Sequence, residues 1–221
     1  MADDWFKNVG RAYNNGCLAG GGSIAVAEFQ ENDPIAWAQC FLQFNEYLPV
    51  GNVRSIAMLP AANFFCDRKI FAKVQGFPLI RAAEDVRLCL RLREIVSVWF
   101  VPQARGFHIF RADRKSYERN QFLLGTHIIL YRRQEYRSWY YKGIFPVLLL
   151  PVFVALKYFG MAKRILSAGP ETFVRFLRVM PLFLWGLLFW TLGFLRGCFI
   201  LTRPPATAPV ENENEICILR K

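Results

Sequence analysis

The chain has 221 residues, of which 54% are hydrophobic and 16% aromatic, and its formal net charge is +11. This length allows one medium domain with a membrane anchor, or one larger domain. A charge of this size is typical of proteins that neighbour nucleic acid or an anionic membrane. A DNA-binding interpretation would depend on the charge alone, because no nucleic-acid-binding motif accompanies it. Many basic residues lie beside apolar segments, which favours the membrane.

Six cysteines are spread along the chain, at positions 17, 40, 66, 89, 198 and 217. They form no C-x-x-C pair and no cluster with histidine, so a structural zinc site is not expected. We expect reduced, mostly buried thiols in a protein that faces a reducing compartment.

The N-terminal part of the chain predicts a helix, a strand and a second helix. Residues 5–16 are expected to form a short helix that ends at an Asn-Gly pair. Residues 17–29 alternate small and apolar side chains, which predicts a strand with a glycine-rich entry. The glycines at 20–22 are not followed by Gly-Lys-Ser/Thr, so close backbone packing explains them better than a phosphate-binding loop. Residues 33–48 predict a helix that begins at an Asp-Pro pair.

The middle of the chain predicts further strands and helices. Residues 55–67 are mostly apolar and are expected to form a strand, after which Asp67 caps a short helix. Residues 84–94 predict an amphipathic helix with two acids in its first turn. A strand is expected next, over 95–102, and a polar and basic segment follows over 103–142.

The composition changes abruptly after Lys142. Residues 143–159 are apolar but contain two prolines, so we expect them to span the membrane with help, or to be re-entrant or interfacial. Residues 179–201 are long and apolar enough to cross a bilayer. The expected division of the chain is a domain over 1–142, membrane-associated helices over 143–201 and a disordered tail over 202–221.

Basic residues set the expected orientation. Residues 105–142 contain nine Lys and Arg against three Asp and Glu, so this flank should be cytoplasmic. The linker between the two apolar segments is also basic, which conflicts with a simple two-span hairpin. The conflict favours a first segment that does not cross.

Several pieces of residues 55–133, taken together, resemble the family 2 glycosyltransferases. AANFFCDRKIFAKVQGFP resembles the family segment G-x-N-x-x-x-R-R-x-x-F-x-x-x-G-G-F, with Asn63 in place but with Ala61 and Gln75 where the family has glycine. AAEDVRLCLRLRE resembles the E-D-x-x-L-x-x-R-L segment, and VPQARGFHIF resembles the strand pair that ends in a histidine, here His108. SYERNQFLLGTHIILYRR, which contains Arg119, is similar to the segment that follows. No single motif is specific, and the resemblance depends on their order and spacing.

The resemblance implies an α/β fold of the type A glycosyltransferase kind, a mixed sheet flanked by helices and followed by membrane helices. It implies transfer of a sugar from a nucleotide-sugar donor to a hydroxyl of a lipid-linked or polysaccharide acceptor, with Mg²⁺ or Mn²⁺ at the diphosphate. In inverting members the aspartate of the E-D pair is the general base, so Asp85 is the expected base and Glu84 orients it or binds acceptor. Local sequence alone would make both acids residues favoured by the helix dipole.

The other candidate site residues keep two interpretations each. His108 matches a histidine that binds the metal or the leaving diphosphate in some relatives, or it is a structural residue at a strand end. Asn63 either binds acceptor or caps a turn. Arg111, Arg114 and Arg119 could meet phosphates, since guanidinium groups match phosphate oxygens, or they could lie in solvent or among lipid headgroups.

The family pattern also contains parts that this sequence does not show. A first strand, an early aspartate and a metal-binding D-x-D should precede the pieces above, yet the chain opens MADDW. We therefore expect the acceptor-side half of a catalytic domain, either truncated or complemented by a partner chain, with an uncovered sheet edge and no activity alone. The alternative is a small non-catalytic membrane protein whose basic domain binds anionic lipids or a partner.

Overall fold

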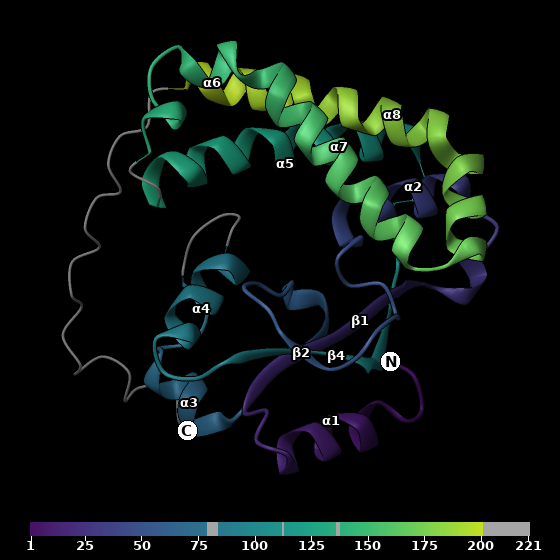
Figure 1. Ribbon diagram of the computed structural model, residues 1–221, viewed down its shortest axis with the longest axis vertical. Helices are drawn as coiled ribbons and strands as arrows, with labels where there is room; N and C mark the ends of the chain where they lie inside the picture. Colours follow the sequence, from purple (N-terminus) through teal and green to yellow (C-terminus); the bar gives the residue numbers. More distant parts are fainter. Residues whose placement is uncertain (79–83, 112, 136–137, 201–221) are drawn as a thin grey trace, which may run out of the picture.

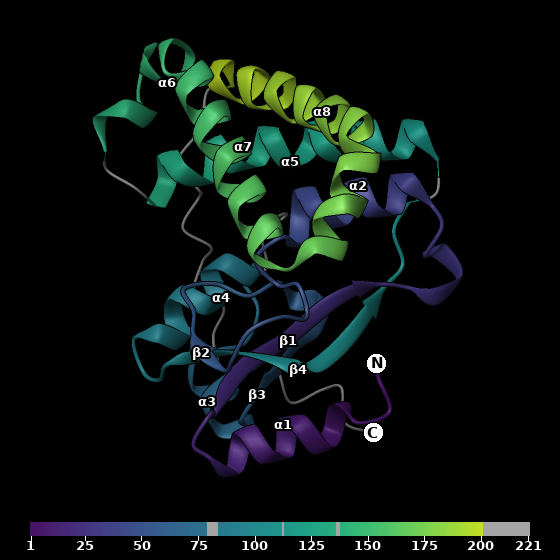
Figure 2. The same ribbon diagram turned by 45° about the vertical axis from the view of Figure 1, so that its right-hand side comes forward.

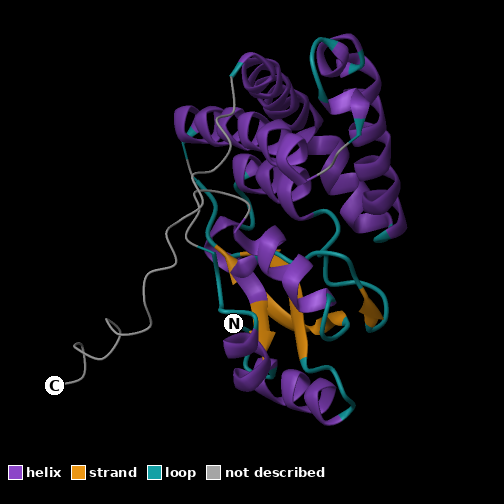
Figure 3. Cartoon of the chain, turned by 90° about the vertical axis from the view of Figure 1, so that its left-hand side faces the viewer, coloured by secondary structure: helices purple, strands orange, loops and turns teal. Residues whose placement is uncertain are grey.

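The fold has two parts, a mixed sheet with its own helices and a layer of longer helices beside it (Figure 1). It comes from a computed structural model that describes residues 1–78, 84–111, 113–135 and 138–200. Figure 3 shows the strands gathered on one side of the molecule and the long helices on the other. The predicted combination of a mixed α/β sheet with a helical C-terminal region is confirmed at this level.

The sheet has four strands in the order β2-β4-β1-β3. β1 (Ala19–Val26) and β4 (Val98–His108) run parallel in its centre. The edge strands β2 (Arg54–Ser55) and β3 (Phe64–Cys66) are short and antiparallel to their neighbours. Short edge strands offer few free backbone groups for pairing with another chain.

Two strand predictions were wrong. Residues 55–67 do not form one strand, because only their ends pair with the sheet and a loop with a single 3-10 turn, η2 (Ala61–Asn63), lies between. β4 continues past the predicted strand end at residue 102 and covers the beginning of the predicted polar segment, up to His108. From Gln103 onward its residues alternate between exposed and buried, as in a strand with one face in solvent.

The triple glycine allows close contact between the two central strands, as predicted. A Cβ atom on Gly22 would lie 1.6 Å from the carbonyl oxygen of Ala104 and 2.5 Å from the side-chain nitrogen of Asn63. The register of β1 against β4 shifts between Gly22 and Ile24. No residue with a side chain fits at this position.

Three helices accompany the sheet. α1 (Trp5–Asn14) packs on β4, α3 (Arg68–Lys73) follows β3, and α4 (Glu84–Arg93) precedes β4. Asp67 accepts hydrogen bonds from the backbone N–H groups of Lys69 and Ile70, which confirms it as the N-cap of α3.

The helical layer consists of α2 (Pro34–Phe44), α5 (Arg114–Glu135), α6 (Phe145–Leu148), α7 (Leu150–Ser167) and α8 (Pro170–Phe199). α5 lies inside the segment that was predicted only as polar and basic. The predicted linker between the apolar segments is also helical, because α7 continues to Ser167 and α8 begins at Pro170. Among the described residues, α8 is the one helix long and apolar enough to cross a membrane.

One hydrophobic core joins the helical layer to the sheet. Phe176, Phe183 and Phe194 on α8 are fully buried against α5, α2 and α7. A Cβ atom on Gly193 would lie 2.0 Å from the carbonyl oxygen of Phe122, so α5 and α8 are in backbone contact. Helices from both sides of residue 142 therefore share their packing (Figure 2).

Candidate active site

The loop before η2 lies between the sheet and α4. Its Leu59 N–H donates to the Cys89 sulfur on α4 at 3.3 Å. Its Met58 carbonyl accepts from the Tyr47 hydroxyl at 3.0 Å, and the Tyr47 carbonyl accepts from Ile24 of β1 at 2.8 Å. These bonds place the loop, the turn after α2 and the start of α4 around one point on the sheet.

Glu84 and Asp85 form the first turn of α4, as predicted. The Asp85 carboxylate accepts from the N–H of Val86 at 2.8 Å and also from the backbone N–H of Ala61 in η2. The two sequence segments that suggested a shared site, around Asn63 and around Asp85, therefore meet in the fold.

The Asp85 side chain is half-buried. Burial raises its pKa, and the charge of neighbouring Glu84 raises it further, whereas the backbone hydrogen bonds oppose the shift. One carboxylate oxygen of Glu84 is buried without a hydrogen-bond partner among the described residues. A carboxylate in this position is held in place and is more basic than one in water, which suits proton acceptance.

Tyr47 was not singled out from the sequence. Its side chain is buried, and burial together with the nearby charges of Glu46 and Asp85 raises its pKa. The aromatic ring therefore contributes to the low-polarity environment of Asp85. No periodicity or motif marks this tyrosine, because it lies in a turn and its contacts are distant in sequence.

His108 ends β4 and lies against two aromatic rings, with centroids 5.2 Å from Phe44 and 4.7 Å from Phe110. Burial lowers its pKa, and the positive charge of Arg111 adds to this effect. The imidazole is therefore neutral near pH 7. Phe44 and Tyr47 flank the turn after α2; Phe44 contacts His108, and the charge of Asp85 acts on Tyr47.

No group of three or more His, Cys, Asp or Glu side chains gathers among the described residues, and His108 has aromatic neighbours. The involvement of Mg²⁺ or Mn²⁺ stays a prediction, and no chemical step below is assigned to a metal.

Asn63 is buried and uses its amide inside the fold. Its NH₂ group donates to the carbonyls of Ser23 and Ala104, both at 2.8 Å, and its oxygen accepts from the Trp5 indole at 2.8 Å. Both amide protons are engaged, so Asn63 positions the loop that carries Ala61. Its binding of acceptor is not supported by this geometry.

The candidate arginines lie apart. Arg111 is exposed and close in sequence to His108, and its carbonyl accepts from Gln39 at 2.7 Å. Arg119 is exposed on α5, in the helical layer. Arg111 acts on one of the candidate site residues, because its positive charge lowers the pKa of His108.

Comparisons with known proteins returned no relatives. No protein-family model, no curated protein and no solved structure matches this chain. The assignment of a function therefore depends on the residues and their geometry.

Proposed function

We propose that this chain is the acceptor-side and membrane-associated portion of an inverting glycosyltransferase, with Asp85 as the general base. The observation that supports it is the position of Asp85, a half-buried carboxylate with a raised pKa, hydrogen-bonded to Ala61 in the segment that resembles a family 2 motif. The family resemblance of the sequence indicates the class of reaction, which is sugar transfer. The carboxylate can act as the general base that this reaction needs.

Asp85 would accept the proton of the acceptor hydroxyl as its oxygen attacks the anomeric carbon of the donor sugar. The new carbon–oxygen bond forms while the bond to the nucleoside diphosphate breaks, and the diphosphate leaves with the electron pair. The bond from the Ala61 N–H holds the carboxylate in place. Glu84, which is beside it, orients Asp85 or binds the acceptor.

Native membranes, in which the nucleotide-binding half of the enzyme accompanies this chain, should transfer labelled sugar from one of a panel of nucleotide sugars to endogenous lipid or polysaccharide. Asp85→Asn should lower this transfer by about 10²- to 10⁴-fold, the range that general-base catalysis provides. The matched control is Glu94→Gln, an exposed carboxylate just after the other end of α4, which should retain transfer. Transfer by Asp85→Asn at the wild-type rate would contradict the proposal.

A second readout separates loss of chemistry from loss of fold. A carboxyl group whose pKa is raised in the folded protein makes that fold less stable at pH values above this pKa, and the penalty disappears on acidification below the ordinary value. Asp85→Asn removes the half-buried charge and should unfold at the same or a higher temperature than wild type at pH 7. A large fall in its melting temperature would mean that Asp85 is a structural residue.

A further inference from the structure

The helices α6, α7 and α8 belong to the helical layer beside the sheet (Figures 1 and 2), and they carry exposed apolar side chains. Ten large hydrophobic residues on these helices are each between 46% and 68% exposed, and six of them are used here: Leu148, Leu156, Phe159, Leu177, Leu188 and Phe199. On α8 the buried residues pack on α5 and α2, so the exposed ones form the opposite face. We call these six residues the outer face.

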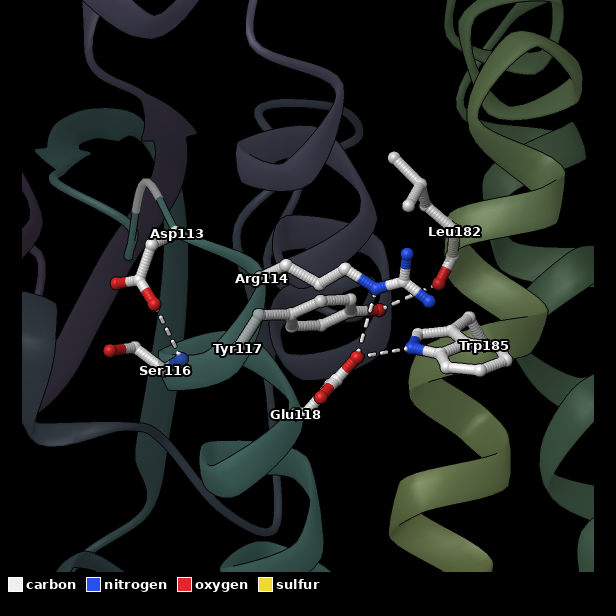
Figure 4. A network of polar contacts seen from close by, with 7 residues as sticks. All are labelled: Asp113, Arg114, Ser116, Tyr117, Glu118, Leu182 and Trp185. Atoms are coloured by element: carbon white, nitrogen blue, oxygen red, sulfur yellow. Dashed lines mark hydrogen bonds and ion pairs between the residues drawn. The ribbon is translucent and has the colours of Figure 1, made fainter.

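Charged residues lie beside the middle of α8. The Trp185 indole donates to Glu118 of α5 at 2.7 Å, and Glu118 pairs with Arg114 at 2.9 Å (Figure 4). The Arg114 guanidinium lies 4.4 Å from the Trp185 ring, and the Tyr117 hydroxyl donates to the Leu182 carbonyl at 2.8 Å. The Arg114 side chain is 58% exposed. If α8 crossed a bilayer centrally, this ion pair would lie near its midplane, where charge is costly.

A second charged group, on α5, limits the length of the apolar part of α8 toward its C-terminal end. Arg133 of α5 donates to the carbonyls of Gly197 and Cys198 of α8, at 3.2 and 2.8 Å. From Trp185 to Gly197 the helix rises about 18 Å at about 1.5 Å per residue. The hydrocarbon core of a bilayer is about 30 Å thick, so the apolar part of the α5–α8 pair is too short to cross it.

We propose that α8 does not cross the membrane, and that the outer face lies in one leaflet of an anionic bilayer with the helices parallel to its plane. Lys163, Arg178 and Arg196 are exposed on α7 and α8 and would meet the negative headgroups around the apolar residues. The sheet, on the opposite side of the helical layer, stays in water (Figure 1). This inference is independent of sugar transfer.

Topology mapping of the full chain in sealed membrane vesicles tests it. Epitope tags are placed before Met1 and after Lys221, and Ser167→Cys, at the C-terminal end of α7, is labelled with a membrane-impermeant maleimide. All three positions should react from the same side. Tags on opposite sides, or a Ser167→Cys that reacts from the side opposite to both tags, would overturn the proposal.

Vesicle flotation tests whether the outer face binds a membrane, independently of the topology mapping. The purified chain should bind vesicles of phosphatidylcholine with phosphatidylglycerol more tightly than phosphatidylcholine alone, and less tightly as salt is added. Phe159→Glu with Leu188→Glu should reduce binding by about tenfold or more. Phe6→Glu, at a still more exposed phenylalanine on α1, should leave binding unchanged. Equal binding by both variants and wild type would count against the outer face.

Discussion

At the scale of single residues, the amide of Asn63 connects three segments of the chain. It bonds to β1 through Ser23, to β4 through Ala104 and to α1 through Trp5. The loop that carries Ala61 is thereby placed against Asp85. The sequence indicated that Asn63 and Asp85 were of interest but could not separate their roles, because the three bonding partners are 40 or more residues away.

Replacing Asn63 by alanine should lower the free energy of unfolding by about 3 kcal/mol, because buried carbonyls and an indole N–H lose their partner. Asn52→Ala, at an exposed loop position, should change it by less than about 0.5 kcal/mol. Denaturant unfolding followed by tryptophan fluorescence measures both. Equal stability of the two variants would show that the Asn63 bonds contribute little.

At the scale of elements, α1, β1, α2, α3 and α4 were predictable because local signals mark them. A glycine-rich strand, an Asp-Pro start and the Asp67 cap each act within a few residues. β4 beyond residue 102 and α5 were not predicted. Glycine and arginine in β4 hide its alternation, and the partner that covers the apolar residues of α5 is α8, distant in sequence.

The contact between β1 and β4 gives a prediction at this scale. Gly22→Ala should destabilise the fold by several kcal/mol or prevent folding, because its Cβ would overlap the Ala104 carbonyl on the neighbouring strand. Gly10→Ala, where nothing lies within 4 Å, should stabilise α1 by about 0.5–1 kcal/mol. Thermal unfolding of the two variants distinguishes a packing requirement from a general effect of replacing glycine.

At the scale of the whole molecule, the boundary at residue 142 is a boundary in composition and not in packing. In space, α2 and α5 from one side of this boundary pack with α7 and α8 from the other. Hydropathy alone could not show this, because it does not record which face of α8 another helix covers. The shared core joins the sheet beside which the candidate site lies to the helices that we propose to lie in the membrane.

The proposed role of Asp85 is tested most directly by the pH dependence of sugar transfer in wild type and Asp85→Asn. Only the deprotonated carboxylate can accept a proton, and its pKa is raised above the ordinary value of 3.8. Wild-type transfer should therefore fall about tenfold per pH unit on acidification, with a midpoint above 3.8. The residual transfer of Asp85→Asn should lack this fall. The same acid limb in both proteins would assign the base to another residue and contradict the account.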